Sequence, residues 1–350
     1  MTVALLIDDH NGNAARVTAE EGDTVLDALL MEGVPFPYSC QSGNCGTCRC
    51  ELVSGDILEL ERSEHALSEC DRMRGVILAC RSQLWSDAHV SRLGDDDFVV
   101  HPSRVLQCQV AAWDRLAGER WRVKLKIVSG GPFDFSAGQY ADLEFAGVAG
   151  RPVACAMANA EGEDTLEFHV MDARGTGSGC PDFEGMEAGR AVKVSGPRGG
   201  AYLRVSHPGP IVLIVSASGV ASAVSLLSTL RHKGLRNELH VYLCLDPAKD
   251  TYGLDELRAA AEGNDRLRFH LLSPSAHAPG RLPVRAMAPA AAMEADFADM
   301  TGFMVYVAGP VRLYEAIAPV LQARGVRRRD ILCDVPVHDD DGIGLTREAA

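Results

Sequence analysis

The sequence is short of basic charge. Its 34 Lys and Arg residues are outnumbered by 48 Asp and Glu residues, which gives a formal net charge of -14 at pH 7. Because binding to a nucleic-acid backbone needs a basic surface, direct recognition of DNA or RNA is not expected. The acidic balance suits a soluble protein whose partners present positive patches, although an acidic surface kept only for solubility gives the same charge.

The sequence also lacks the signals of a membrane or secreted protein. Its longest apolar stretch, 211–227, is broken by serines and a glycine, which is typical of a strand, a turn and the start of a helix. The N-terminus has no basic n-region, and acidic residues interrupt its apolar run, so no signal peptide is expected. Eleven cysteines in such a chain do not indicate a disulfide scaffold, and we expect a cytoplasmic protein whose cysteines are thiols or metal ligands.

A length of 350 residues fits two or three domains, and the hydrophobic pattern changes twice along the chain. Residues 1–97 combine an alternating strand at 2–8, a helical pattern at 24–32 and a cysteine-rich loop, and they end in a charged stretch that suits a linker. Residues 98–206 contain short strands between Gly and Pro turns, which predicts a small antiparallel barrel. Residues 207–350 alternate strands with helical segments, which predicts a parallel α/β layer.

The strongest motif is a set of four cysteines. Cys40, Cys45 and Cys48 have C-x4-C-x2-C spacing, and Cys80 follows after 31 intervening residues. This spacing with a distant fourth cysteine is the signature of a plant-type [2Fe–2S] cluster, whose two irons need four converging thiolates. A zinc site is the alternative, but zinc sites favour paired C-x2-C knuckles.

Four further residues bear on this prediction. Gly43 and Gly46 suit a loop that wraps closely around a cluster and points backbone N–H groups at its sulfurs. Cys50 and Cys70 compete as ligands, but Cys50 follows Cys48 on a strand and is expected to face away. We leave both out of the ligand set.

Beyond the cluster, the chain resembles the reductase components of aromatic-ring (Rieske-type) dioxygenase systems, especially the naphthalene-dioxygenase-like reductases. The resemblance covers essentially the whole chain. The segments that carry it are 101–104 (HPSR), 135–140 (FSAGQY), 167–169 (EFH), 195–203 (SGPRGGAYL) and 309–310 (GP).

The resemblance implies an α+β and α/β multidomain protein. It implies a β-grasp [2Fe–2S] ferredoxin domain at 1–97, an FAD-binding antiparallel β-barrel at 98–206 and an NAD(P)-binding-like parallel α/β domain at 207–350. The family's chemistry takes a hydride from NADH to FAD and passes single electrons through the cluster to a ferredoxin or an oxygenase.

The sequence departs from the family at the flavin site. The family has Arg-x-Tyr-Ser there, with the Tyr on the flavin and the Arg on its pyrophosphate. Aligned from Arg151, the Tyr and Ser become Val153 and Ala154; aligned from Asn159, they become Cys155 and Ala156. Backbone groups remain to hold the isoalloxazine edge, so FAD is still expected. The residues carried over as cofactor-binding are Arg151, Pro152, Val153, Ala154, Cys155, His169, Gly175, Thr176, Gly177 and Ser178. A structural role for His169 is the alternative, and so is a plain loop at 174–178.

The departure is larger at the nucleotide site. The family's glycine-rich turn lets the backbone approach a pyrophosphate, but here only Gly219 of it remains. An acidic residue replaces an Arg at the end of the next strand, and the thiol of a Cys-Gly-Pro motif and a C-terminal aromatic are missing. The residues of this degenerate site are Val215, Ser216, Ala217, Ser218, Gly219, Asp246, Ala308, Gly309 and Pro310. Hydride transfer from NAD(P)H is therefore expected to be lost or crippled, unless a variant cofactor pose is tolerated, and no catalytic side chain is assigned.

Three functions fit these observations. The first is a redox-coupled regulator, similar in kind to a regulatory offshoot of the family that governs tetralin-degradation genes. It would be a monomer that exchanges electrons with a ferredoxin and signals to a protein partner such as a transcription activator. The second is an active NADH-dependent reductase of a ring-hydroxylating dioxygenase. The third is a plain electron carrier without flavin.

Overall fold

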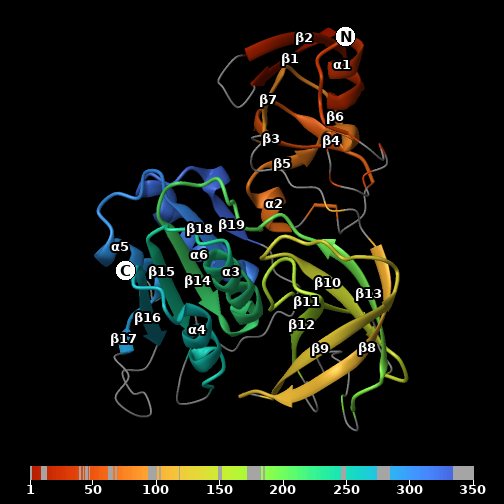
Figure 1. Cartoon of the computed structure of the whole chain (residues 1–350). Coiled ribbons are helices and arrows are strands. Elements are labelled where there is room, and N and C mark those ends of the chain that lie inside the picture. The colour runs from red at the N-terminus through yellow and green to blue at the C-terminus, as the bar shows by residue number, and fades with distance from the viewer. Residues whose placement is uncertain are drawn as a thin grey trace. The chain divides into compact units, whose positions relative to one another are not determined.

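The chain forms two compact units in the computed structural model, unit 1 at residues 1–100 and unit 2 at residues 101–350 (Figure 1). No helix in the part of the chain that the structure describes is long and apolar enough to cross a membrane. The described residues are 2–8, 14–38, 41, 43, 46, 48–61, 66–67, 69–93, 101, 104–117, 119–148, 152–171, 183, 186–245, 250–273 and 284–333.

Unit 1 has a mixed five-stranded sheet in the order β2-β1-β7-β3-β5 and a separate pair, β4-β6. Its elements are β1 (Thr2–Asp8), β2 (Ala14–Glu20), α1 (Val25–Met31), β3 (Arg49–Ser54), β4 (Ile57–Glu59), α2 (Glu69–Met73), β5 (Val76–Leu78), a 3-10 turn (Ala79–Arg81), β6 (Ser82–Leu84) and β7 (Ala88–Arg92).

Helix α1 begins at a capping threonine and buries its apolar face in the core of unit 1. The hydroxyl of Thr24 accepts a hydrogen bond from the backbone N–H of Asp27 at 3.1 Å, which satisfies one of the first-turn donors. Val25, Leu26 and Leu29 join the core against the sheet. A helix packed on a mixed sheet, with β1 parallel to β7, is the β-grasp arrangement that the resemblance predicts.

The first half of unit 2 is an antiparallel barrel in the order β11-β10-β13-β8-β9-β12. The two outer strands meet through a bridge between Met157 and Phe168 and through a hydrogen bond from Ala158 N to Glu167 O of 2.7 Å. Alternate side chains fill its core, Met157 among them. The strands are β8 (Arg104–Arg115), β9 (Arg120–Ser129), β10 (Tyr140–Phe145), β11 (Val153–Ala156), β12 (Thr165–Met171) and β13 (Ala191–Arg198).

The second half of unit 2 is a parallel sheet in the order β17-β16-β15-β14-β18-β19. Helix α3 packs beside α4, and α5 beside α6, as expected for crossover connections. The strand order reverses between β14 and β18, where open parallel sheets hold their ligands at the carboxyl edge. The elements are β14 (Ile211–Ser216), α3 (Val220–His232), β15 (Leu239–Cys244), α4 (Leu254–Ala261), β16 (Leu267–Ser273), β17 (Val284–Ala286), α5 (Pro289–Asp296), β18 (Met304–Ala308), α6 (Val311–Ala323), a 3-10 turn (Arg328–Asp330) and β19 (Ile331–Cys333).

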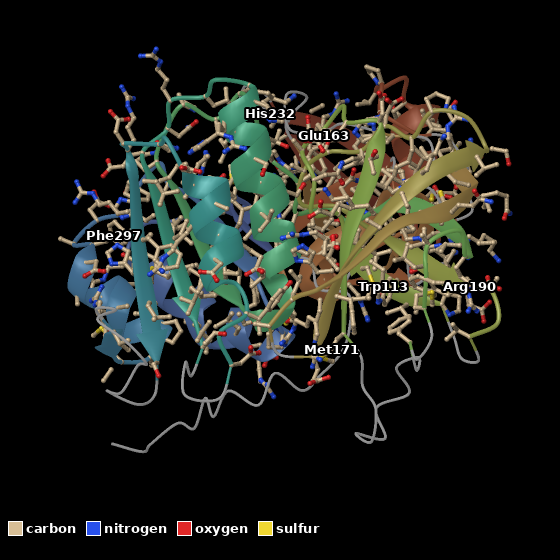
Figure 2. All side chains as sticks on the ribbon, turned by 60° about the horizontal axis from the view of Figure 1, so that its bottom comes forward. Trp113, Glu163, Met171, Arg190, His232 and Phe297 are labelled. Carbon is tan, nitrogen blue, oxygen red and sulfur yellow. The ribbon has the colours of Figure 1, made fainter. Side chains whose placement is uncertain are left out.

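The face of this sheet away from α3 carries a stack of aromatic side chains. Figure 2 shows the sheet between Phe297, on this side, and His232, the last residue of α3. The ring of His270 stacks on Tyr242 with centroids 4.3 Å apart and on His240 at 6.2 Å. Phe297 meets His240 edge-on, which closes the stack.

This stack predicts a pH dependence of stability. Burial lowers the pKa of His240 and of His270, against the opposing attraction of nearby carboxylates. The unfolded chain therefore binds more protons than the folded one once the pH falls below about 6.5, and the free energy of unfolding decreases. We expect wild type to lose stability relative to His270→Phe, which keeps the stacking, between pH 7.5 and 5.5. Urea unfolding of both proteins across this range measures the difference, and parallel curves would contradict the expectation.

Candidate cluster, flavin and nucleotide sites

The loop between α1 and β3 has a backbone suited to enclosing a cluster. Gln41, Gly43 and Gly46 all have positive φ, at 54°, 76° and 72°. Left-handed residues are typical of turns whose backbone N–H groups bind a negatively charged group. The positive φ values show that both glycines take a conformation that favours glycine, and the wrapping of the loop around a cluster stays a prediction, since Cys40 and Cys45 lie outside the described residues.

Cys48 and Cys80 are brought together at the end of this loop. Their Sγ atoms lie 3.2 Å apart and both residues are buried, so the distance is too long for a disulfide bond of about 2.05 Å. Two thiolates that share one metal at about 2.3 Å are separated by about 3.8 Å, which this pair approaches. The contact with Cys80, together with burial, raises the pKa of the Cys48 thiol, so a thiolate here needs a neighbouring cation. The pair fits one iron of a cluster.

Cys50 lies in the apolar core and not in the cluster loop. It is fully buried in the core of unit 1, and burial raises the pKa of its thiol to about 12. Such a group behaves as a small apolar side chain. The side chain of Cys70 lies outside the described residues.

The candidate flavin strand is β11, at the edge of the barrel sheet. It pairs with β10, from Tyr140–Ala156 to Leu143–Val153, and its other backbone edge forms no ladder among the described residues. Val153 and Cys155, the two positions at which the alignments place the family's Tyr, both point into the barrel core. Just beyond this strand Met157 bridges to Phe168 of β12, and the main-chain groups of β11 remain the candidates to hold a flavin. Arg151 and residues 175–178 lie outside the described residues, and Pro152 is exposed.

His169 on β12 is held by side chains of both halves of unit 2. Its Nδ1 lies 2.7 Å from the hydroxyl of Tyr252, and its Nε2 lies 3.5 Å from Glu167. Arg120 covers the Tyr252 ring at 4.5 Å and forms an ion pair with Asp250 at 2.6 Å. These contacts tie the barrel to the segment before α4, and they give His169 a structural role beside its predicted place at the flavin.

A polar seam joins helix α3 to the barrel. Ser225 Oγ donates to the carbonyl of Asn159 at 2.7 Å, and Thr229 Oγ1 accepts from Glu161 N at 3.1 Å. Lys233 extends the seam with an ion pair of 2.7 Å to Glu161. Ser225 and Thr229 are fully buried, so the seam fixes where α3 begins relative to β11.

The turn after β14 is closed rather than open. Residues Ala217–Gly219 form a turn of 3-10 helix, and Val215, Ser216 and Ala217 are all buried. The side chain of Val215 belongs to the hydrophobic core beside α3, so it fills the core and does not protrude into the loop. Val215, which was counted with the degenerate site from the sequence, therefore adds no bulk to the turn.

The surviving glycines of this site have a packing role. A Cβ on Gly219 would lie 2.0 Å from the carbonyl oxygen of Ala308, and a Cβ on Gly309 would lie 2.6 Å from Ser216 Oγ. The structure therefore brings the two halves of the predicted site together, at the ends of β14 and β18. Tight contact between these ends explains both glycines without a bound phosphate.

Two serine hydroxyls also lie at this site. Ser218 Oγ lies 3.2 Å from Ser216 Oγ, and no side chain caps the start of α3. The dipole of α3 favours an anion at this end of the helix. Pro310 precedes α6, and Asp246 lies outside the described residues.

Comparison with known proteins agrees with this organisation. Residues 8–84 match the family model described as "2Fe-2S iron-sulfur cluster binding domain". The chain is 30% identical over 312 residues to the ferredoxin–NAD(P)(+) reductase component of the naphthalene 1,2-dioxygenase/salicylate 5-hydroxylase systems of Ralstonia sp., covering 89% of this chain and 92% of the relative. It is 31% identical over 322 residues to the reductase subunit of an aromatic O-demethylase from Amycolatopsis sp., covering 90% and 94%.

Solved structures show the same fold over the whole chain. A cytochrome P450 reductase of Amycolatopsis aligns with a TM-score of 0.59 at 29% identity, covering 95% of this chain and 98% of that one. The ferredoxin reductase in carbazole 1,9a-dioxygenase aligns with a TM-score of 0.57 at 20% identity, covering 96% and 99%.

Fold and cluster loop together define a [2Fe–2S] domain joined to a flavoprotein reductase module. The chain belongs to the family of ferredoxin–NAD(P)(+) reductase components of bacterial oxygenase systems.

Proposed function

We propose that this protein is an iron–sulfur flavoprotein of the reductase family whose oxidation of NAD(P)H is impaired and which acts as a redox-coupled regulator. Cys40, Cys45, Cys48 and Cys80 hold its cluster. Electrons pass between the cluster and a ferredoxin, and the redox state is read by a protein partner such as a transcription activator of aromatic-degradation genes.

One observation carries the loss of NAD(P)H use. In the turn after β14, where the family keeps its glycines, Ala217 and Gly219 are buried, and Gly219 packs against Ala308. A pyrophosphate needs N–H groups that it can approach closely, and the buried residues of this turn limit that approach. A dinucleotide would have to open the contact between β14 and β18 before it could bind.

FAD remains part of the proposal because its contacts here rest on the backbone. The backbone of β11, Val153–Ala156, supplies N–H and C=O groups to an isoalloxazine edge whatever the side chains are. FAD, when bound, supplies the redox chemistry that the side chains of this chain lack. The seam of Ser225 and Thr229 orients α3 beside this strand.

The acidic net charge of the chain favours a protein partner over a nucleic acid. The net charge of -14 disfavours direct contact with DNA, so a regulatory signal would pass through another protein. Relatives include the ferredoxin–NAD(P)(+) reductase component of Pseudomonas putida, which is 29% identical over 313 residues and whose name places a ferredoxin beside it.

Electron exchange with a ferredoxin tests the proposal. We expect a reduced ferredoxin of a dioxygenase system to bleach the cluster absorption of the oxidised protein when the two are mixed without oxygen. The Cys48→Ala variant, which removes a ligand, is the control and should show no such bleaching. A wild-type protein that exchanges no electrons with any ferredoxin tried would contradict the proposal.

The second candidate is an active NADH-dependent reductase, and the relatives favour it, because their names are those of reductase components. It requires the turn after β14 to rearrange on nucleotide binding. Reduction of both centres by NADH distinguishes it from the first.

A further inference from the structure

Arg49 is half-buried beside the cluster loop, in a position that no function described so far uses. It follows Cys48 directly and opens strand β3. Its Nε and Nη2 atoms both donate to the carbonyl oxygen of Ala66, at 3.1 and 2.8 Å, and its side chain is only 12% exposed. Two N–H groups of the guanidinium thus share one carbonyl acceptor, which holds the group in place.

The same guanidinium lies against the cluster loop itself. A Cβ added to Gly46 would be 3.1 Å from Arg49 Nε and 3.2 Å from Arg49 Nη2. Gly46 stands between Cys45 and Cys48 in the sequence, so the cation packs on the backbone of the turn that joins them. Arg49 therefore links the cluster loop to the segment at Ala66.

A carboxylate on α2 completes the arrangement. Asp71 Oδ2 lies 3.9 Å from Arg49 Nη1, and Asp71 Oδ1 lies 3.2 Å from Arg74 Nη1. Asp71 and Arg74 are buried as well, with side chains 4% and 5% exposed. Charges in such surroundings are screened weakly by solvent and salt, so they act on a neighbouring redox centre.

The sign of this effect follows from the charges. One-electron reduction adds a negative charge to a [2Fe–2S] cluster, and the potential of such clusters depends on net charge and hydrogen bonding around the sulfurs. A guanidinium stays protonated at any physiological pH. It stabilises the reduced cluster more than the oxidised one and raises the reduction potential.

We propose that Arg49 is a positioning residue of the iron–sulfur centre, which holds the cluster loop in place and keeps the reduction potential of the cluster high. The negative charge of Asp71 lowers the reduction potential and so partly offsets the effect of Arg49. The proposal requires the cluster alone and is independent of whether NAD(P)H is used.

Redox titration of the full-length protein tests this role. The cluster potential is measured with mediators, without oxygen, from its visible circular dichroism. For Arg49→Gln we expect a more negative potential, with electron uptake at equilibrium at least tenfold weaker, which is 59 mV for a one-electron couple. Arg49→Lys keeps the charge and should recover most of this loss. Arg72→Gln, whose side chain is 54% exposed on α2, is the matched control and should leave the potential unchanged.

Asp71→Asn gives a second test of opposite sign. Removing the carboxylate leaves more positive charge beside the loop, so the potential should become more positive. This variant decides the matter if Arg49→Gln does not assemble a cluster. A potential unchanged in Arg49→Gln, a loss in Arg49→Lys equal to that in Arg49→Gln, or a negative shift in Asp71→Asn would each overturn the proposal.

Discussion

Cys48→Ala is expected to abolish the visible absorption of the cluster and to leave the rest of the chain folded. Cys48 and Cys80 meet at 3.2 Å in a buried position, so loss of one thiolate removes half of the pair that fits a single iron. A cluster with three thiolates is not held by the plant-type arrangement. Iron content per chain and the visible spectrum after anaerobic purification measure the effect.

Cys50→Ala is the matched control for this prediction. Cys50 lies two residues away and is just as buried, but it belongs to the apolar core. Its truncation should cost about 1 kcal/mol of stability and leave the cluster intact. A cluster that survives in Cys48→Ala, or is lost in Cys50→Ala, would mean that the ligand set is wrong.

Gly219→Ala is the second change with a large expected effect. The new Cβ would lie 2.0 Å from the backbone carbonyl oxygen of Ala308, and a strand end cannot yield as a flexible side chain does. We expect the free energy of unfolding of unit 2 to fall by about 3 kcal/mol or more. Urea unfolding, followed by far-ultraviolet circular dichroism, gives the value.

Gly234→Ala separates packing from backbone strain. Gly234 also lies in unit 2 and has a φ of 63°, but a Cβ there meets nothing within 4 Å. Its substitution should lower the free energy of unfolding by about 1–2 kcal/mol, which is the cost of holding a residue with a Cβ in the left-handed conformation. Equal losses in the two variants would show that β14 and β18 are not in tight contact, and the turn would then be open to a nucleotide.

Much of the fold follows from the sequence because its long elements have strong periodicity. The strand at 2–8, the helix at 24–32 and the buried strand beginning at Ile211 appear as predicted. The fold class, a ferredoxin domain followed by a barrel and a parallel sheet, is confirmed.

Several of the elements that the sequence did not predict are short or lie at an edge. Strand β11 lies in a run of small residues whose alternation is weak, and β17 and β19 have three residues each. Such segments take their conformation from a neighbouring strand rather than from their own pattern. The charged stretch at 94–97, expected as a linker, lies outside the described residues.

Some contacts of the candidate sites could be predicted from the sequence, and others could not. Spacing alone predicted that Cys48 and Cys80 meet, because four cysteines with this pattern have few other uses. The contact of His169 with Tyr252 joins residues 83 positions apart, and no local sequence pattern predicts it. Val215 was counted with the degenerate nucleotide site because the family has glycine there, but β14 continues through Ser216 and its alternation turns Val215 into the core.

The spectrum of the anaerobically purified protein, recorded during addition of NADH, then NADPH, then dithionite, tests the central claim most directly. The proposed function predicts flavin and cluster bands that neither nucleotide bleaches and that dithionite does. Bleaching of both centres by NADH within seconds would contradict it, and the closed turn at Ala217–Gly219 would then be one state of a working nucleotide site.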